Sequence, residues 1–296
     1  MLVLPALIVA LLWQGQATQG PPGVPARFDS SRAYEHLRQL VAIGPRPAGS
    51  AAIEEARKYI KGQLMAMGLA ATEQAFDART PSGTIHMVNL RVTIPGGRRE
   101  RILVTGHYDT KRERDFRFVG ANDGGSSAAF LLEMARVLKG RKSAFTYELV
   151  FLDGEEAVFE WAGTDHTYGS QYYVDRARAD GTLASIKANI LVDMIADRDL
   201  RIRRDDNSTP WLTDMVWAAA RSVKQSAHFL DEHTQVEDDH LPFMRAGVPS
   251  VDIIDLEYAP WHTAGDTIDA VSAGSLQVVG DVVLAALPAI EVRLAR

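Results

Sequence analysis

The sequence has no cysteine in its 296 residues. Disulfide bonds and thiolate metal sites are therefore excluded, and only histidine, aspartate or glutamate could hold a metal ion. Such ligands suit zinc or a harder divalent ion, without deciding between them. An excess of basic residues is lacking too, since the net charge is −6. This charge argues against a nucleic-acid partner, which usually needs a basic face.

Charge is absent from the N-terminus, where Arg27 is the first charged residue. The apolar run 2–13 (LVLPALIVALLW) is too short to span a membrane comfortably and fits the core of a secretory signal peptide. We therefore expect residues 1–19 to be a signal peptide, residues 20–29 to be a flexible lead-in, and the protein to be periplasmic or secreted. The alternative is a membrane anchor that is never cleaved. After cleavage, no stable membrane partner is expected.

Internal repeats, low-complexity segments and a convincing linker are lacking after residue 27, which favours one catalytic domain over residues 30–296. Helical spacing predicts helices over 30–43, 51–67, 124–139, 209–225 and 272–295. Short β-type segments predict strands over 71–78, 86–94, 101–109, 147–154, 185–195 and 250–256, with a hairpin candidate at 95–100. This alternation predicts an α/β fold with a central mixed, mostly parallel sheet and helices on both faces.

Acidic and histidine side chains follow several of the predicted strands. In open α/β sheets ligands bind outside the carboxyl ends of the strands, so we expect these side chains to meet at one edge. Each one alone is more often a turn former, a helix cap or a surface residue. Taken together, they favour a functional site. The set comprises His107, Asp109, Asp123, Glu155, Glu156, Asp193, Asp238, Asp239, His240 and His262.

The stretch LVFLDGEEAVFEW (149–161) places Asp153, Glu155 and Glu156 within four residues. If the backbone stays extended, the adjacent glutamates point in opposite directions, so that one can bind a metal while the other acts as a general base beside it. Catalytic zinc keeps three protein ligands and one open position, and carboxylates with one imidazole can supply those ligands. We expect Asp153 to support the turn.

Six motifs carry a family resemblance. GHYDTK, FVGANDGGSSAAFLLEMARVL, LVFLDGEEA, NILVDM, DDHLPF and WHT resemble the co-catalytic zinc aminopeptidase superfamily from about residue 30 to the C-terminus. FLDGEEAVFEWAGTDHTYGS, VEDDHLPFMRAGVPS and PWHT narrow the resemblance to the animal-type glutaminyl cyclases. At the position of Asp238 the aminopeptidases commonly have a small residue such as Ser. The resemblance therefore implies a zinc-aminopeptidase-like fold and cyclase activity.

The cyclase resemblance also implies roles for single residues. Asp123, Glu156 and His262 would bind one zinc ion per chain, and Glu155 would carry the proton during catalysis. The implied activity converts the N-terminal Gln, and weakly Glu, of peptides to pyroglutamate, with ammonia released from Gln. Peptide or protein N-termini would be the substrates, and we expect a monomer.

Further roles follow from the same resemblance. Asp193 and Asp238 would complete a hydrogen-bonded acidic network, and Trp161 and Trp261 would form the walls of the substrate pocket. Glu237 would contact substrate, although it stands where the animal enzymes tend to have Gln.

The chain departs from the animal pattern elsewhere too. Asp252 stands where the animal enzymes tend to have His, and their paired cysteines are absent. On its own, Asp252 could cap a strand end. We expect His166, His228 and His233 to be surface residues, and Tyr168 to pack in the interior.

Two other functions remain open at this point. In a two-zinc aminopeptidase, His107 and Asp193 would hold a second ion, Asp123 would bridge the two ions, and Glu155 would activate water. In a cyclase, His107 and Asp109 would be vestigial or would support the site. The third reading is an inactive peptide-binding ectodomain, which is disfavoured because no carboxylate or imidazole of the inferred site is missing.

Overall fold

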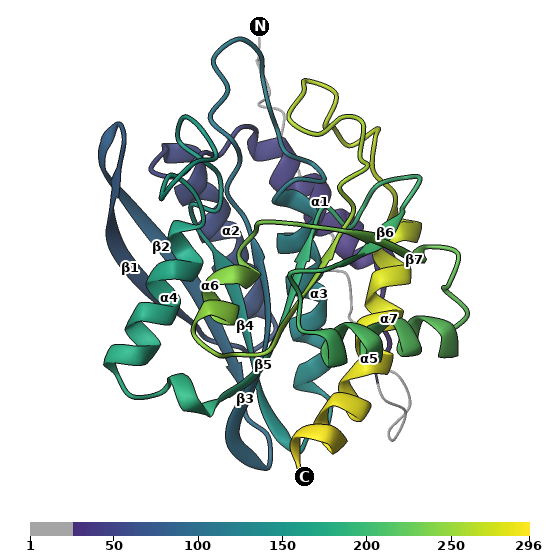
Figure 1. Ribbon diagram of the computed structural model, residues 1–296. Coiled ribbons are helices and arrows are strands. Elements are labelled where there is room, and N and C mark those ends of the chain that lie inside the picture. Colours follow the sequence, from purple (N-terminus) through teal and green to yellow (C-terminus); the bar gives the residue numbers. More distant parts are fainter. Residues whose placement is uncertain (1–25) are drawn as a thin grey trace, which may run out of the picture.

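The computed structural model describes residues 26–296, which form a central sheet between layers of helices (Figure 1). The predicted signal peptide, residues 1–19, and residues 20–25 of the predicted lead-in lie outside the described residues. The sheet has six strands in the order β1-β2-β4-β3-β5-β8. The strands are β1 (Ala71–Thr80), β2 (Gly83–Ile94), β3 (Arg98–His107), β4 (Phe145–Leu152), β5 (Ile186–Asp193) and β8 (Ser250–Ile254).

Four neighbouring strands, β4, β3, β5 and β8, pair in parallel, whereas β1 pairs with β2 and β2 with β4 in antiparallel fashion. Strands β4 and β8 are buried along their whole length, and β5 is buried at all but one residue. Their sequences are correspondingly apolar on both sides, as expected for parallel strands covered on both faces. The predicted fold class is confirmed.

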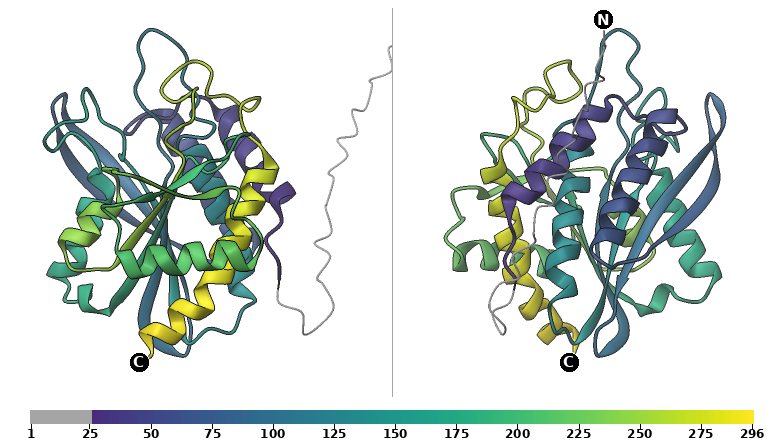
Figure 2. Two further views of the ribbon diagram at one scale, coloured as in Figure 1. Left: turned by 45° about the vertical axis from the view of Figure 1, so that its right-hand side comes forward. Right: turned by 180° about the vertical axis from the view of Figure 1, so that it is seen from behind.

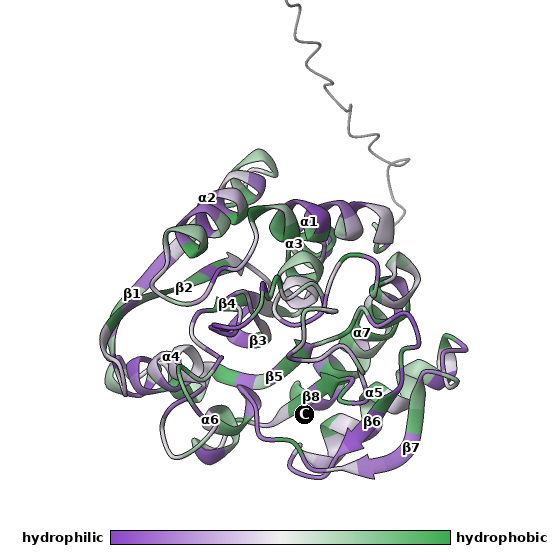
Figure 3. Cartoon of the chain, turned by 90° about the horizontal axis from the view of Figure 1, so that it is seen from above, coloured by the Kyte–Doolittle hydropathy of each residue, from purple (hydrophilic) through white to green (hydrophobic). Residues whose placement is uncertain are grey.

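Helices cover both faces of the sheet (Figure 2). Helices α1 (Ser30–Ile43), α2 (Ala51–Ala66), α3 (Gly125–Lys139) and α7 (Ala273–Leu294) pack on one face. Helices α4 (Tyr168–Ala179) and α6 (His240–Arg245) pack on the other (Figure 3). Helix α5 (Pro210–Ser222) lies against α7, near the two-stranded sheet of β6 (Ile202–Asp205) and β7 (Phe229–Thr234). A short 3-10 helix, η1 (Leu183–Ser185), precedes β5.

Helix α7 is long and apolar enough, by length and composition, to cross a membrane. More than half of its apolar window is buried, and the helix contacts α1, α3 and α5. Its apolar residues Leu276, Val279, Val283 and Leu287 belong to the main hydrophobic core. These contacts are typical of the core helix of a globular domain.

The predicted hairpin at 95–100 is wrong. Strands β2 and β3 lie on opposite sides of β4 and do not pair with each other. The connection passes the start of β4 so closely that a Cβ atom at Gly96 would collide with the carbonyl group of Phe145. The hairpin of this sheet joins β1 to β2 through residues 81–82. A turn-like sequence between two strands therefore gave no information on which strands pair.

Candidate active site

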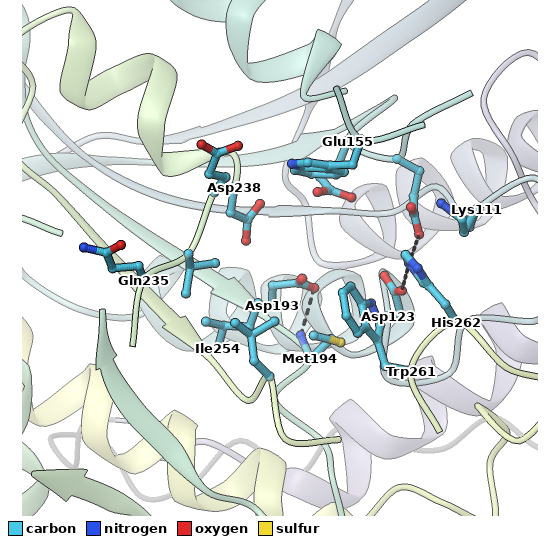
Figure 4. A pocket seen from close by; sticks show the side chains of 15 residues that line it. Lys111, Asp123, Glu155, Asp193, Met194, Gln235, Asp238, Ile254, Trp261 and His262 are labelled. Carbon is cyan, nitrogen blue, oxygen red and sulfur yellow. Dashed lines mark hydrogen bonds and ion pairs between the residues drawn. The ribbon is translucent and has the colours of Figure 1, made fainter. Parts of the chain in front are cut away.

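A pocket of about 360 Å³ opens at the carboxyl ends of the parallel strands (Figure 4). Strand β3 ends at His107 and β5 at Asp193, so the residues beyond them meet at this edge, as the strand-end rule predicts. Most of the predicted metal ligands, acidic residues and aromatic residues line the pocket, whereas His107, Asp109 and Asp239 do not. Those that line it are Asp123, Glu155, Glu156, Trp161, Asp193, Glu237, Asp238, Trp261 and His262.

Asp123, Glu156 and His262 form one compact group, the ligand triad. The Nε2 atom of His262 lies 3.2 Å from Asp123 Oδ2 and 3.4 Å from Glu156 Oε1. One ligand atom from each residue lies within 4.8 Å of the other two. Asp123 Oδ2 and both Glu156 oxygens are buried and have no hydrogen-bond partner among the described residues. Because buried polar atoms are nearly always satisfied, the ligand triad fits a bound dication.

The pKa values of the ligand triad also favour a bound dication. Burial raises the pKa of Glu156 to about 7, and the neighbouring Asp123 carboxylate adds to this effect. Burial lowers the pKa of His262, but the nearby carboxylates of Asp123 and Glu156 outweigh burial and raise that pKa to about 9. Burial also raises the pKa of Asp123, yet the imidazoles of His107 and His262, each 3.2 Å away, hold that pKa below its usual value. The group therefore retains protons that a divalent cation would displace.

The loop before α3 fixes the Asp123 backbone. The Asp266 carboxylate accepts hydrogen bonds from the N–H groups of Asn122 (2.8 Å) and Asp123 (3.1 Å). Tyr258 donates its hydroxyl hydrogen to the same carboxylate at 2.8 Å. Gly124 has a φ of 75°, and a Cβ atom there would collide with the carbonyl oxygen of Asp109. Glycine is therefore required beside this ligand candidate.

Backbone strain also gathers at the site. His262 has a φ of 50° and Met194, which follows Asp193, has a φ of 45°. Residues other than glycine rarely adopt this left-handed conformation, and it persists where the surrounding structure imposes it. The surrounding structure therefore holds His262, a ligand candidate, and Met194, at the end of β5, in conformations that they would not adopt freely.

Glu155 and Glu156 diverge, and the chain does not stay extended between β4 and the pair. Gly154 has a φ of 71°, which turns the chain after β4. Asp109 Oδ1 then accepts a hydrogen bond from Glu155 N at 3.2 Å, and Asp109 Oδ2 accepts one from Glu156 N at 3.4 Å. Glu156 faces His262, whereas Glu155 Oε2 lies 3.7 Å from His107 Nδ1. The turn and Asp109 thus separate the two side chains.

His107, Asp123 and Asp193 form a second group, the inner triad, in which Asp123 and Asp193 line the pocket and His107 does not. The Nε2 atom of His107 lies 3.0 Å from Asp193 Oδ1 and 3.2 Å from Asp123 Oδ1. Asp193 Oδ1 also accepts a hydrogen bond from Met194 N at 2.8 Å. Burial lowers the pKa of His107, but Asp193 and Glu155 outweigh it and raise that pKa well above its usual value. The inner triad can therefore be satisfied without an ion.

Three buried acids lie beside these triads. Burial raises the pKa values of Glu155 and Asp238 well above their usual range, and it raises that of Asp239 to about 7. Neighbouring carboxylates add to each shift. Carboxyl groups packed this closely cannot all ionise at low cost. Asp238 is coupled electrostatically to Asp193, and the hydrogen-bonded network predicted from these two residues stays a prediction.

Two tryptophans stand at the pocket. Trp161 is 36% exposed and Trp261 44% exposed. The Trp161 ring stacks on His166 with centroids 4.3 Å apart, and the Trp261 ring lies 4.5 Å from that of His262. Exposed aromatic surface beside a pocket is typical of a ligand contact. His166 is buried under Trp161, so the prediction of a surface histidine is wrong there.

Some of the other predictions for single residues are confirmed and others are wrong. Asp252 lies in the middle of β8 and is fully buried, so it caps no strand end. Asp153 accepts a hydrogen bond from Val88 N at 2.8 Å and therefore joins β4 to β2. Tyr168 is buried, as predicted. His233 is exposed and His228 is partly buried.

Sequence reasoning missed several pocket residues. They include Lys111, Met194, Gln235, Val236, Ile254 and Leu256. Ile254 ends β8 and Leu256 follows it, so the strand-end rule could have found both. The loop positions of Lys111 and Gln235 carry no comparable signal.

Arg46 was also missed. Its guanidinium group is fully buried and donates hydrogen bonds to the carbonyl groups of Tyr108 (2.8 Å), Val119 (2.7 Å) and Gly120 (2.9 Å). These carbonyl groups belong to the end of the β3 segment and to the loop that carries Asp123. Arg46 therefore fastens the two backbone segments that supply acidic residues to the site.

Comparisons with known proteins agree with this arrangement. The profile of peptidase family M28 matches residues 89–287. A glutaminyl-peptide cyclotransferase-like protein of Mus musculus is 29% identical over 280 residues, which cover 82% of this chain and 71% of the mouse protein.

Solved structures are similar over nearly the whole chain. The crystal structure of an Acidobacteriales bacterium glutaminyl cyclase is 43% identical with a TM-score of 0.88, and the match covers 94% of this chain and 100% of that one. A leucine aminopeptidase precursor of Bacteroides thetaiotaomicron is 26% identical with a TM-score of 0.81, covering 89% and 98%. The bacterial cyclase shares more of its sequence with this chain than the mouse protein does. The resemblance to glutaminyl cyclases therefore holds, but its restriction to the animal type does not follow.

Proposed function

We propose, from the premise that this chain belongs to peptidase family M28, that it is a glutaminyl-peptide cyclotransferase acting on peptide N-termini. Its similarity to a bacterial glutaminyl cyclase over 94% of its length supports the proposal. The reaction joins the α-amine of N-terminal Gln to the carbonyl carbon of its own side chain and releases ammonia. N-terminal Glu would react weakly and release water. Since both reacting groups belong to one residue, the protein supplies orientation, charge stabilisation and proton transfer.

One zinc ion would be held by Asp123, Glu156 and His262. Three protein ligands leave a fourth position open, as catalytic zinc requires. When bound there, zinc would supply Lewis acidity toward the side-chain carbonyl group of the substrate. Asp109 would hold Glu156 in place, and Asp266 would hold Asp123, through the hydrogen bonds that these carboxylates accept from the backbone N–H groups of the two ligands.

Glu155 would be the proton carrier. Its carboxylate would take a proton from the α-amine as the nitrogen attacks, and would then give that proton to the departing amide nitrogen, which leaves as ammonia. Burial raises the pKa of Glu155 well above its usual value, which suits a group that must both accept and donate near neutral pH. Its place next to Glu156 would bring it beside the polarised carbonyl group.

Asp193 and Asp238 would hold the substrate amine and share a proton with Glu155. The positions of Met194 N and His107 fix Asp193, because both lie within 3.0 Å of its Oδ1 atom. Burial raises the pKa of Asp238 well above its usual value, so this group would keep a proton while Asp193 accepts hydrogen bonds. The pair would orient the amine before attack.

Trp161 and Trp261 would enclose the apolar part of the N-terminal residue. Both rings line the pocket next to the ligand triad. Glu237 also lines the pocket but is exposed, so it would meet the following residue of the peptide.

The observation that most favours one zinc ion over two is the set of unsatisfied oxygens in the ligand triad. Asp123 Oδ2 and both Glu156 oxygens lack hydrogen-bond partners among residues 26–296. In the inner triad, by contrast, Asp193 Oδ1 has a backbone N–H group and an imidazole as partners. Of these two triads, the ligand triad would therefore gain more from a bound cation.

The alternative is a two-zinc aminopeptidase. It is favoured by the convergence of Asp123 Oδ1 and Asp193 Oδ1 on one nitrogen of His107, which could accommodate a second ion. The similarity to a leucine aminopeptidase precursor supports it as well. In that enzyme Glu155 would activate water instead of an amine.

An assay pair separates the two functions. Purified protein is incubated with Gln-β-naphthylamide and with Leu-p-nitroanilide, and ammonia and free aromatic amine are measured. A cyclase releases ammonia from the first substrate and leaves the second intact. Release of p-nitroaniline without ammonia would refute the proposal, and a zinc content near two per chain would point the same way.

Three further parts of the proposal rest on the sequence alone. They are export directed by residues 1–19, a monomeric state, and a catalytic domain over residues 30–296. Size-exclusion chromatography and N-terminal sequencing of the protein purified from its host test them directly.

A further inference from the structure

A third group of buried side chains lies outside the pocket wall. Asp205 ends β6, His240 begins α6 and Asp252 lies within β8, and all three are buried. The Nε2 atom of His240 lies 3.1 Å from Asp205 Oδ2, and its Nδ1 atom lies 3.6 Å from Asp252 Oδ2. We call these three residues the bridge cluster.

One ligand atom from each residue of the bridge cluster lies within 4.8 Å of the other two, as in the ligand triad, but the carboxylates are arranged differently around the imidazole. In the ligand triad, both carboxylates face the same nitrogen of His262, so the ligand atoms converge on one point. In the bridge cluster, the two carboxylates face opposite nitrogens of His240. An ion can bind only one ring nitrogen of a histidine, whereas a single imidazole can contact a different carboxyl group at each of its two nitrogens. The arrangement therefore suits an imidazole that links two acids.

Asp205 holds the chain on both sides of Asp238. Its Oδ1 atom accepts a hydrogen bond from Val236 N at 3.0 Å, and its Oδ2 atom faces His240. Asn207 adds a hydrogen bond from its side-chain amide to Val236 O at 2.7 Å. Residues 236 and 240 are thus fastened to one carboxylate, and Asp238 lies midway between them.

The charges around the cluster agree with this role. Burial raises the pKa of Asp205, but the nearby His240 imidazole and a hydrogen bond from Ser208 outweigh burial and bring that pKa below its usual value, so Asp205 is an anion. Burial and the charges of Asp238 and Asp205 raise the pKa of Asp252 well above its usual value. Both Asp252 oxygens and both ring nitrogens of His240 lack a hydrogen-bond partner within residues 26–296, and the contact between the two residues is the 3.6 Å approach of Nδ1 to Oδ2.

We propose that His240 is a positioning residue that bridges Asp205 and Asp252 and thereby fixes Asp238 in the pocket. The inference rests on the proposed function, in which Asp238 orients the reacting group. Without the bridge, residues 236–240 lose one of their two attachments to Asp205, and Asp238 moves relative to Glu155. A displacement of about 1 Å at a catalytic constellation can cost about 100-fold in rate.

The test uses three variants of the full chain. His240→Gln keeps a donor near the Nε2 position and therefore toward Asp205, His240→Asn keeps one near Nδ1, and His240→Ala keeps neither. Each is made in the natural background and in Asp238→Asn, and kcat, KM, zinc content and melting temperature are measured. His228→Ala is the matched control, because that imidazole contacts the Leu200 carbonyl group and lies outside the pocket.

We expect His240→Ala to lower kcat by about 10- to 100-fold with KM and zinc content nearly unchanged. His240→Gln should recover most of the rate, His240→Asn should not, and the control should behave like the natural protein. In the Asp238→Asn background the loss caused by His240→Ala should disappear, since the histidine acts through that residue. If His240→Ala does not fold, the difference in kcat between His240→Gln and His240→Asn tests the inference.

Three results would overturn the inference. They are an unchanged kcat in His240→Ala, equal losses in the Gln and Asn variants, and an equal loss with and without Asp238→Asn. A zinc ion that persists in His262→Ala and is lost on changing His240 would instead reveal a metal site. If the natural protein hydrolyses Leu-p-nitroanilide instead of releasing ammonia, the proposed function fails, and the same variant set is then measured on that hydrolysis.

Discussion

Glu155→Gln should stop turnover without removing zinc. The amide has the size of the carboxyl group that it replaces, so the contact with His107 and the backbone hydrogen bond to Asp109 can persist. The amide cannot accept a proton from the substrate amine and return it to the leaving nitrogen, as the carboxyl group can. General acid–base groups typically contribute about 100- to 10,000-fold, which corresponds to about 3–5 kcal/mol of the activation barrier.

The structure also sets the expectation for folding. Glu155 is buried, and burial raises its pKa well above the usual value, so its charged form is disfavoured in the folded protein. A neutral amide removes that difficulty, and we expect the melting temperature to stay equal or to rise. Zinc should remain at one per chain, because Glu155 is not part of the ligand triad.

Glu156→Gln is the matched control, since the same atoms change one residue further along. Both Glu156 oxygens lack a hydrogen-bond partner among the described residues, and Oε1 lies 3.4 Å from His262 Nε2. Loss of a direct ligand should weaken zinc binding by more than the roughly 10- to 100-fold typical of outer partners. Steady-state ammonia release and elemental analysis after gel filtration measure both outcomes. If Glu155→Gln lost its zinc while Glu156→Gln kept it, the assigned roles would be reversed and the reasoning refuted.

Three further predictions concern residues around the site. Trp261→Ala should raise KM for Gln-β-naphthylamide by about tenfold or more by removing an aromatic contact, and an unchanged KM would place the substrate elsewhere. Gly124→Ala should destabilise the protein by at least about 1–3 kcal/mol in urea unfolding, because alanine resists the left-handed backbone and its Cβ meets the Asp109 carbonyl group. Arg46→Lys should lower the free energy of unfolding by about 1.5 kcal/mol or more and weaken zinc binding, since one ammonium group cannot replace three guanidinium contacts. Arg101→Lys, at the far end of β3, is the control and should leave zinc affinity intact.

The parts of the site that follow strand ends could be predicted from the sequence. His107, Asp193 and the Glu155–Glu156 pair follow apolar strands directly, and the carboxyl ends of parallel strands share one edge. The alternation of apolar strands and helices likewise predicted the sheet and its two helical layers. Local pattern suffices here because the relevant neighbours are set by chain direction and burial.

Contacts between distant segments could not be predicted. The pairing of β2 with β4 instead of β3 depends on a long-range order that a turn sequence does not encode. Arg46 and Asp266 act on the Asp123 loop from positions about 75 and 140 residues away. The bridge between Asp205 and His240 joins two elements, β6 and α6, that showed no clear periodic signal. Buried polar residues of this kind look like ordinary surface residues until the fold is known.

The ligand triad has a further consequence for a chain that contains no cysteine. Asp123, Glu156 and His262 belong to three segments far apart along the sequence, and His262 lies on a loop next to two exposed residues, Trp261 and Thr263. An ion held by all three would act as a reversible crosslink between those segments. Because the unfolded chain does not present this site, the stabilisation would grow with the logarithm of the free zinc concentration. The resistance of this protein to unfolding would then depend on the zinc supply of its compartment and not on the oxidising conditions on which disulfide-linked proteins depend.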